Sequence, residues 1–565
     1  MRSAFFEFNV AISGAFAARA NLEVIGHNIS NAAIPGYSRQ EPLQKAGEPL
    51  PLYNGKGMVG TGSDAYGVER IRDAFLDTKY WTKHCMLGEY DFKDSQLTIM
   101  ENVFNEMSEG AGLAESFDRF FAQASELATT SNDATYRTNL VQSADSLAQI
   151  INANAQALQK QQLDANTEFL LVVNEMNSIG EQIVSLNKQI VTYELDGSHA
   201  NDLRDERTRL VDRLSELVNV TVYERSNNRY IVMINGYDFI NHDLINNLKT
   251  IERNDSDAIV ENNSKSPMDA QGLFDLIFAG TGITFDINSA SLKGELRGII
   301  DMRDGNGTGV VYSLSGDEIV VPRYKGVPYY MNKLNNLTRR FALAIDHGLY
   351  ADGADLPPGT LLSDGITPAG YAQTDYFSGT PIQNVLGHSK GIDLNGQKLG
   401  TLMFTYAGGP TNGMDLTTTN PTFYNEMSCL NFIVNPNLFQ DPSLLNCAST
   451  ADNGSPSLGE SANTVPLGMS LIKNNASLFR EGKLLDYVVA INSELGIDSR
   501  QAKDFNASYT DLLSAIDNQR TDVSGVDINE EMVRMVKCQQ LYQASAKLVS
   551  TINSIYDTLI NRLGA

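Results

Sequence analysis

The sequence predicts a multidomain α+β protein, in which both ends of the chain build terminal coiled-coil helices and a long-helix bundle, with two inserted β-rich domains. Three observations support this. With 565 residues the chain is too long for a single hydrophobic core. Ten of the seventeen prolines fall from Pro357 to Pro466, and none lies between Pro51 and Pro267 or after Pro466. The proline-free flanks permit long helices, and apolar residues recur there at helical spacing.

Each end of the chain carries an apolar stripe at the spacing of a coiled coil. The N-terminal stripe, broken at Arg19 and Gly26, consists of Phe5, Phe8, Ile12, Ala15, Leu22 and Ile29. The C-terminal stripe, with Gln539 in it and a three-residue slip near Ser545, consists of Ile528, Met532, Met535, Tyr542, Val549, Ile552, Tyr556, Leu559 and Leu563. Because such stripes pair with each other, we expect residues 1–33 and 525–565 to form one terminal coiled-coil assembly domain.

The distribution of charge fits self-association through the two ends. The chain has a net charge of −25. Residues 1–50 carry four basic and four acidic side chains, and residues 516–565 carry five basic and six acidic ones, so the ends are nearly neutral. Near-neutral ends can pack against copies of themselves, whereas the acidic middle stays solvated. The pair cannot bury all its faces alone, so we expect it to become fully ordered only when neighbouring copies cover it.

The helical body is expected to comprise residues 34–219, 293–350 and 466–524. Within it, apolar residues from Phe169 to Tyr193 follow an alternating three-and-four spacing that predicts a heptad seam. Residues 200–219 predict a further helix, with charges of alternating sign on its solvent side.

The β-rich domains are expected at residues 220–292 and 351–465. Val220, Val222, Tyr230 and Val232 alternate with other residues, and Asn235-Gly236 is a hairpin signal. Residues 351–465 are acidic and rich in proline, glycine, threonine and asparagine, a composition typical of strands and turns.

Composition excludes several classes of partner. An acidic chain without a lysine or arginine cluster does not suit a nucleic-acid backbone, and no run approaches 18 apolar residues, so we expect no membrane span. The four cysteines lie far apart, which disfavours a disulfide framework or a cysteine zinc site. The first residues loosely imitate a signal peptide, but Glu7, Asn9 and Ser13 favour an amphipathic helix.

Sites for chemistry are weakly motivated. Gly55 to Gly60 form a G-x-G-x-x-G string without a strand–turn–helix frame, so a flexible loop is the better interpretation than a dinucleotide site. The calcium-loop spacing that begins at Asp304 has Ser315 where a glutamate is needed. His84 and Cys85 are only sequence neighbours. We therefore predict no catalytic residue, no metal and no cofactor, and expect that the protein is not an enzyme.

A longer motif follows the first helix, from His27 to Gln40. Asn28 and Asn31 tolerate the left-handed geometry that ends a helix, and Pro35-Gly36 suits the centre of a type II turn before Tyr37 and Arg39. This stretch resembles the N-terminal signature of the bacterial flagellar rod, hook and hook-associated proteins. His27 stands where that family usually has asparagine.

Three further stretches narrow the resemblance to the hook-associated branch of the family at the hook–filament junction. Residues 201–212 and 294–304 look like its two internal signatures, and residues 524–531 with 539–547 are similar to its C-terminal end. Cys538 departs from the family, which commonly has an aromatic residue there. The motif and assembly residues that the resemblance and the stripes single out are Asn28, Asn31, Pro35, Gly36, Tyr37, Arg39, Ser524, Gly525, Val526, Glu530, Glu531, Gln540, Tyr542, Ala544, Val549, Ile552 and Leu559.

The resemblance implies a structural role. Members form a ring that joins hook and filament, contact the hook protein and a second junction protein or the filament, and are secreted to the flagellum through the flagellar type III export apparatus. An export chaperone of the FlgN type binds their C-terminal helix. Three alternatives stay open at this point: a hook or distal rod axial protein, a secreted cell-wall-acting enzyme, and an adhesin that uses residues 351–465.

Overall fold

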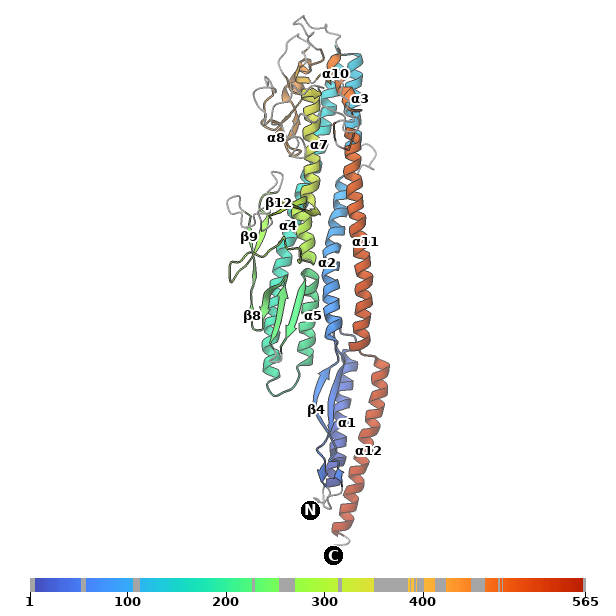
Figure 1. The fold of residues 1–565 in the computed structure, drawn as a ribbon. Coiled ribbons are helices and arrows are strands. Elements are labelled where there is room, and N and C mark those ends of the chain that lie inside the picture. The colour runs from blue at the N-terminus through green and yellow to red at the C-terminus, as the bar shows by residue number, and fades with distance from the viewer. Residues whose placement is uncertain are drawn as a thin grey trace.

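The computed structural model describes residues 6–51, 57–104, 112–225, 229–253, 270–312, 318–349, 385–386, 388–390, 393, 401–411, 423–448, 463–475, 478–479 and 481–561. The molecule is elongated, with a helical rod along its length and both chain termini together at one end (Figure 1). Long helices and several small sheets make up a multidomain α+β fold, as the sequence predicts.

The terminal module is the part at the end that holds both termini. It consists of α1 (Phe6–Asn31), α12 (Ile528–Asn561), and the strands β1 (Gln40–Ala46), β2 (Leu50–Pro51), β3 (Met58–Val59) and β4 (Ser63–Arg70). The two helices run antiparallel beside each other, and the β1–β4 hairpin lies against α1 (Figure 1). The sequence assigned residues 40–70 to the helical body; they instead form this hairpin, because Pro42, Gly67 and the short apolar alternation disfavour a helix.

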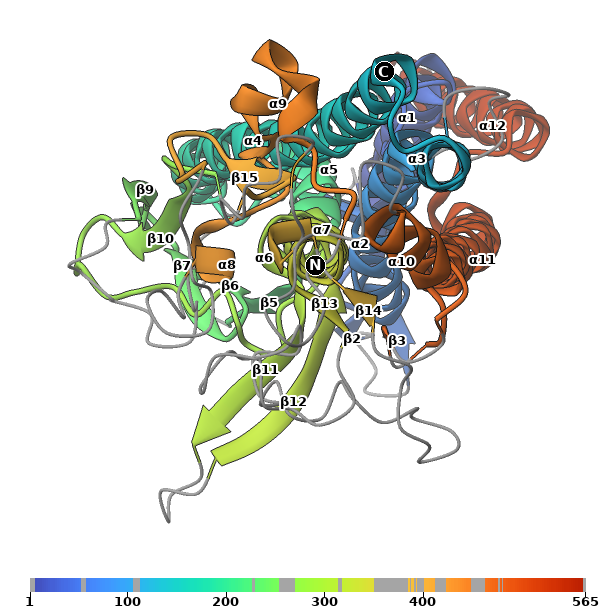
Figure 2. The same ribbon diagram turned by 90° about the horizontal axis from the view of Figure 1, so that it is seen from above.

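Eight helices of the described residues build the helical body. They are α2 (Ala74–Val103), α3 (Leu113–Thr129), α4 (Ala134–Tyr193), α5 (Asn201–Leu217), α6 (Glu295–Asp304), α7 (Val327–His347), α10 (Thr464–Ile472) and α11 (Leu484–Ser524). Asp73 and Asp133 cap the first turns of α2 and α4 with their carboxylates. Viewed from above, α2 lies between α11 on one side and α6 on the other, so the two ends of the chain share one bundle (Figure 2).

A β unit covers one side of α4. Strands β5 (Val220–Glu224), β6 (Tyr230–Ile234), β7 (Tyr237–Asn241) and β8 (Leu244–Ile245) form an antiparallel sheet in chain order, and β9 (Leu248–Glu252) pairs with β10 (Phe274–Phe278). Asn235 and Gly236 have φ of 46° and 84°, as the hairpin between β6 and β7 requires. All six strands lie within residues 220–292, where the sequence predicted β structure.

The seam from Phe169 to Tyr193 differs from the predicted coiled coil. Its residues are buried as far as Ile190, but Val173, Gly180 and Val184 are buried as well. The buried face is therefore wider than a heptad seam, because α4 packs against α5 on one side and against the strands on the other. The side-chain amide of Asn177 in α4 hydrogen-bonds to both the N–H and the C=O of Leu248 (2.8 and 2.7 Å), as the backbone of a neighbouring strand would.

The β hairpin β11 (Asn306–Tyr312) and β12 (Glu318–Lys325) interrupts residues 293–350, which the sequence assigned to the helical body. The runs Val310-Val311 and Ile319-Val320-Val321 are β-branched, and such residues favour strands.

Of residues 351–465, the structure describes a few short elements at the end of the body opposite the terminal module. They are β14 (Val385–Leu386), which pairs with β13 (Gly348–Leu349), then η2 (His388–Lys390), β15 (Phe404–Tyr406), α8 (Phe423–Glu426), β16 (Phe432–Val434), α9 (Pro436–Gln440) and η3 (Pro442–Leu444). Phe404 of β15 joins Phe117, Phe120 and Phe341 in the aromatic centre of one of two large cores. The other core lies between α4, α5 and the β unit.

Candidate assembly site at the joint of terminal module and body

The register of the α1–α12 pair is set by two contacts between its ends. Asn28 Nδ2 donates to Glu531 Oε2 (3.2 Å), and a Cβ placed on Gly14 would lie 3.2 Å from Ser545 Oγ. The two contacts are separated by the same 14 positions on each helix, from 14 to 28 and from 531 to 545. Two heptads of regular antiparallel pairing therefore separate them.

The face of α12 that packs against α1 differs from the predicted apolar stripe. Besides Glu531 and Arg534, the residues of α12 that are not exposed are Met535, Cys538, Ser545, Val549, Ile552 and Tyr556. This sequence passes through Cys538 and Ser545 without the predicted slip, because a small polar side chain fits where Gly14 faces it. Ile528 and Met532 lie outside the seam and are 44% and 52% exposed.

On α1 the predicted stripe also lies beside the most buried face. Phe8, Ile12, Ala15, Leu22 and Ile29 are half-buried, and Phe5 lies outside the described residues. The buried positions of α1 are mostly small: Ala11, Ala17, Ala18, Ile25 and Asn28. Small side chains allow α12 and the β1–β4 hairpin to approach the helix closely from two directions.

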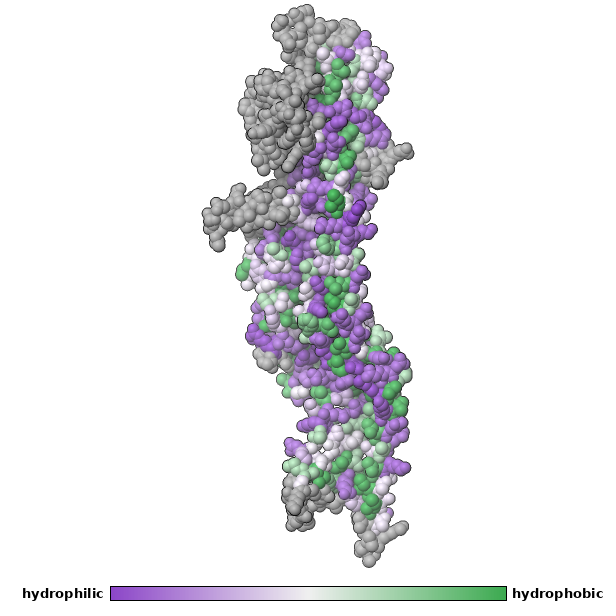
Figure 3. Space-filling model, turned by 45° about the vertical axis from the view of Figure 1, so that its right-hand side comes forward, coloured by the Kyte–Doolittle hydropathy of each residue, from purple (hydrophilic) through white to green (hydrophobic). Residues whose placement is uncertain are grey.

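Apolar side chains remain uncovered on the outside of α12. Leu541, Leu548 and Ile555 follow one another at seven-residue spacing and are more than half exposed. Phe16 of α1 is exposed as well. Figure 3 shows green, apolar residues spread over this end of the molecule. Exposed apolar residues that recur along one face of a helix suit a protein–protein interface.

The turn after α1 has the geometry that its sequence predicts. Tyr37 N donates to Ile34 O (3.2 Å), and Gly36 has φ of 82°, the value that the third position of a type II turn requires. Pro35 occupies the second position. Asn28 and Asn31, which the sequence suggested for left-handed geometry at the helix end, instead both stay helical, and Asn31 binds His27 O through its amide (3.0 Å).

Asn28 is the centre of the motif. Its side-chain amide pairs with the backbone of Gln40 in both directions, donating to O (2.9 Å) and accepting from N (3.0 Å). Its oxygen also accepts from Tyr37 Oη (2.8 Å), and its nitrogen reaches Glu531. Burial raises the pKa of Tyr37, and the nearby carboxylates of Asp202, Asp205 and Glu531 raise it further, so the phenol keeps its proton for this bond.

Three chain segments meet where the terminal module joins the body, and backbone bonds tie them together. They are the segment before β1, the segment after β4, and the break between α11 and α12. Arg39 N donates to Ser524 O (2.7 Å), and Arg39 O accepts from Ile71 N (2.8 Å). Arg39 therefore lies between the other two segments, and we call these three hydrogen-bonded segments the clasp. Below it, Arg534 of α12 binds Glu41 and Glu530 (2.9 and 2.8 Å).

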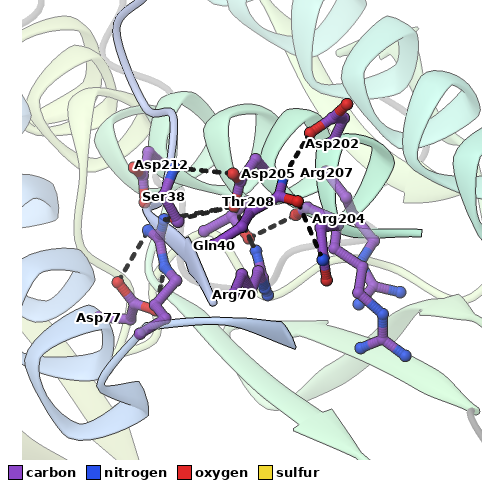
Figure 4. A network of polar contacts seen from close by, with 12 residues as sticks. Ser38, Gln40, Arg70, Asp77, Asp202, Arg204, Asp205, Arg207, Thr208 and Asp212 are labelled. Atoms are coloured by element: carbon purple, nitrogen blue, oxygen red, sulfur yellow. Dashed lines mark hydrogen bonds and ion pairs between the residues drawn. The ribbon is translucent and has the colours of Figure 1, made fainter. Parts of the chain in front are cut away.

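Asp205 of α5 anchors this clasp to the body (Figure 4). Its carboxylate accepts from Ser38 N and Ser38 Oγ (both 2.8 Å) and from Arg70 Nη1 (2.7 Å). All three side chains are buried or nearly so. Beside it, Gln40 Nε2 donates to Asp202 Oδ1 (2.7 Å). Charged hydrogen bonds in a buried place are strong and directional, so the position of the clasp on α5 is well defined.

A second carboxylate pair continues the network to α2 and α11. Arg72 binds both oxygens of Asp77 (2.8 and 2.9 Å). Arg520 of α11 bridges Asp77 and Asp212 (3.1 and 2.8 Å), and Asp212 also accepts from Trp81 Nε1 (2.6 Å). The opposing charges of this network compensate one another, which a buried charge requires.

The structure therefore brings together three of the four stretches that the sequence singled out. Residues 27–40, 201–212 and 524–531 meet at the joint. The stretch 294–304 forms α6 and lies higher on the body, where Asp301 binds the buried Lys93 (2.7 Å). Sequence reasoning missed Ser38, Asp77 and Arg520 as joint residues. Ser38 and Arg520 stand among polar neighbours, so no local pattern marks them or indicates their partners.

Other predicted residues have simpler positions. Gln540 and Ala544 are exposed on α12, Tyr542 is 43% exposed, and Val526 lies in the break before α12. Leu559 belongs to α12, but its side chain is outside the described residues, as is Leu563 altogether. Gly525 ends α11 where a Cβ would meet Thr521 O at 2.4 Å.

The residues considered for chemistry have structural partners. Asp304 is paired with Arg303 and Arg253, which lower the pKa of its carboxyl to about 2 against the effect of burial. His84 bonds the backbone of Asp212, and burial raises the pKa of the Cys85 thiol to about 12. Part of the Gly55–Gly60 string lies outside the described residues. Where the structure is described, no group of three or more acidic, histidine or cysteine side chains could hold a metal ion. None of the described helices combines the length and apolarity that crossing a bilayer requires.

Comparison with known proteins gives consistent matches. Residues 97–359 match the family described as the flagellar hook-associated protein FlgK helical domain, and residues 518–563 match the C-terminal family of the flagellar basal body rod FlgEFG proteins. Flagellar hook-associated protein 1 of Bacillus subtilis is 26% identical over 100% of this chain and 99% of its own length. The Escherichia coli protein of that name is 24% identical over 98% and 99%.

The fold is also similar to that of a solved structure. The flagellar hook junction protein FlgK from Burkholderia pseudomallei matches with a TM-score of 0.54 and 15% sequence identity, covering 79% of this chain and 100% of that one.

Proposed function

The chain belongs to the family of flagellar hook-associated protein 1, a structural component of the bacterial flagellum, and we propose that it forms the junction ring that connects the hook to the filament. In this role it contacts the hook on one side and a second junction protein or the filament on the other. It is secreted through the flagellar type III apparatus and assembles through its terminal helices.

The observation that carries the proposal is the pairing of the two ends of the chain in one module with uncovered apolar residues. Asn28 and Glu531 join helices from opposite ends, and Leu541, Leu548 and Ile555 remain exposed outside their seam. A second copy placed beside the module would bury these side chains and add to its stability, at roughly 1.5–3 kcal/mol for each large apolar side chain. Repetition of one such contact around an axis closes a ring.

Helix α12 is also the part of the chain that we propose to act in export and chaperone binding. The exposed apolar residues of α12 suit an amphipathic helix that a chaperone of the FlgN type could hold before assembly. In the assembled ring those residues would face neighbouring copies, so chaperone and ring contacts would exclude each other.

Deletion of the gene tests the proposal. We expect electron microscopy to show hooks without filaments, and a blot of the culture medium to show released flagellin. Reintroduction of the full chain should restore filaments. Missing hooks would instead place the protein in the hook or distal rod, and normal filaments would contradict the proposed role altogether.

A further inference from the structure

We infer that Asp205 is a positioning residue that locks the terminal module at one angle to the helical body, so that the joint acts as a rigid coupling rather than a hinge. The inference rests on the proposed function, because a ring built through the module can hold the body in place only if the two parts do not swivel. It goes beyond that function in assigning the angle to one carboxylate.

The joint lies outside the hydrophobic cores. Both large hydrophobic cores lie in the body, and neither includes a residue of α1, of β1–β4 or of α12. The chain crosses the joint twice, after β4 and between α11 and α12. At the Ser524–Gly525 break α11 ends and α12 starts again at Ile528, so no continuous helix crosses the joint there. Without further contacts, two crossings of this kind would permit rotation.

The clasp alone is weak. It consists of two backbone bonds, Arg39 N to Ser524 O and Ile71 N to Arg39 O. These bonds hold the three segments to one another, but they do not orient them against α5. An added contact to the body must supply the orientation.

Asp205 supplies such a contact. It binds two of the three segments of the clasp at once: Ser38, just before β1, and Arg70, at the end of β4. The third segment is attached to Ser38 through its neighbour Arg39, which bonds Ser524. Arg72 strengthens the arrangement by donating to Ser38 Oγ (3.1 Å) while it binds Asp77 of α2. Every segment of the clasp therefore reaches Asp205 directly or through one further hydrogen bond.

A buried polar contact suits this task better than an apolar one. Apolar surfaces can slide over each other with little change in energy, whereas carboxylate, hydroxyl and guanidinium groups bind at specific distances and angles. Asp205 accepts from a backbone N–H, a hydroxyl and a guanidinium at 2.7–2.8 Å, and such an arrangement has one orientation of lowest energy.

The test uses Asp205→Asn in the full-length chain. Asparagine has nearly the same shape, but its amide nitrogen would face the N–H of Ser38 or the guanidinium of Arg70, both of which are donors. Spin labels at Gln189→Cys in α4 and Gln543→Cys in α12 report the distance between body and module, since both glutamines are exposed. Cys538→Ser prevents labelling in the seam, and the other three cysteines are buried.

Double electron–electron resonance should give one narrow distance distribution for the parent chain. We expect Asp205→Asn to broaden this distribution by at least about twofold, or to split it, while circular dichroism and the thermal transition of the body stay unchanged. Glu206→Gln is the matched control: Glu206 is the next residue of α5, is half-buried, and pairs with Arg209 (2.5 Å) away from the clasp segments. It should leave the distribution narrow.

A second variant keeps the inference testable if Asp205→Asn does not fold. Ser38→Ala removes the hydroxyl that accepts from Arg72 and donates to Asp205, but leaves the backbone bond in place. It should broaden the distribution less than Asp205→Asn. An unchanged distribution in both variants would overturn the inference. The measurement uses purified protein, so its failure is distinct from a failure of the deletion experiment, which tests the ring itself.

Discussion

Asn28 donates a hydrogen bond to the carboxylate of Glu531 although 503 positions separate the two residues in the chain. Asn28 is 1% exposed, and Glu531 is 1% exposed as well. The same asparagine completes the backbone pairing of Gln40, so one side chain connects the first helix, the hairpin and the last helix. This contact joins the two ends of the sequence into one structural module.

Replacement of Asn28 by aspartate should destabilise the module. A carboxylate at this position cannot donate to Gln40 O and would face the carboxylate of Glu531, so we expect a loss of about 3 kcal/mol in the local free energy of unfolding. Hydrogen–deuterium exchange of residues 6–46 measures that loss.

A second substitution serves as the control for Asn28→Asp. Addition of Glu531→Gln removes one negative charge and supplies an amide that can donate to the new carboxylate, so part of the protection should return. If the double variant exchanges as fast as Asn28→Asp alone, the two side chains are not coupled.

Replacement of Val549 or Ile552 by aspartate should abolish assembly. Both residues lie in the half-buried seam of α12, and placing a charge there costs about 2–4 kcal/mol or prevents pairing with α1. We expect filaments to be lost in cells, while the purified variants keep the circular dichroism of the body. Ser550→Asp is the control, because Ser550 is exposed on the same turn. Normal filaments with Val549→Asp would show that the seam is not needed.

Two glycines should respond in opposite ways to alanine. A Cβ on Gly88 would lie 2.3 Å from the backbone oxygen of Glu216, where α2 crosses α5, and a backbone atom cannot move aside. Gly88→Ala should therefore lower the free energy of unfolding by about 3 kcal/mol. Gly26 in α1 has no atom within 4 Å of such a Cβ, so Gly26→Ala should stabilise the helix by about 1 kcal/mol.

Urea unfolding followed by circular dichroism suits Gly88→Ala, and hydrogen–deuterium exchange of α1 suits Gly26→Ala. An equal change in the free energy of unfolding in the two variants would contradict the close approach of α2 and α5.

The segment around His388 should weaken in acid. His388 Nε2 accepts from Asn446 N (2.9 Å), so its proton lies on Nδ1 and bonds Thr401 O (2.8 Å). Burial lowers the pKa of His388 to about 4. In the unfolded chain this histidine has an ordinary pKa of about 6.5, so it binds a proton at a pH where the folded chain does not. The free energy of unfolding therefore falls as the pH drops from about 6.5 to about 4, by up to about 3 kcal/mol.

Hydrogen–deuterium exchange of residues 401–411 and 423–448, corrected for the intrinsic rate at each pH, measures this loss. His388→Gln offers a donor and an acceptor without a titrating group, and it should remove most of the pH dependence between 4 and 6.5. A variant that weakens as steeply as the parent chain would assign the effect to a group other than His388.

Several features of the joint follow from the sequence. The type II turn at Pro35-Gly36 is local, since proline presets one angle and glycine permits the next. The resemblance to the family also singled out Asn28 and Glu531. The partners of Asp205, by contrast, lie at Ser38 and Arg70, more than a hundred positions away, and no spacing rule connects charges at that separation.

The register of the two terminal helices shows the same division. The heptad pattern of α12 predicts a seam, but the sequence placed a slip at Ser545, where the structure has none. The small side chain of Ser545 does not interrupt the seam, because the residue that faces it on α1 is Gly14. The hairpin over residues 40–70 was missed for a related reason: it is stabilised by packing on α1 and not by strong β propensity of its own.

By itself the sequence determined most of the long helices, the strands that begin at Val220 and the turn at Pro35-Gly36, because these depend on side-chain spacing and backbone preference within a few residues. It did not determine the hairpins at residues 40–70 and 306–325. It also determined, through proline placement and charge, that the two ends are helical, apolar along one side and nearly neutral. Only the tertiary structure decided which face of each helix is covered, that three distant segments share one clasp, and that Asp205 holds them. Such contacts depend on distances in space between residues remote in the chain, which local periodicity does not encode.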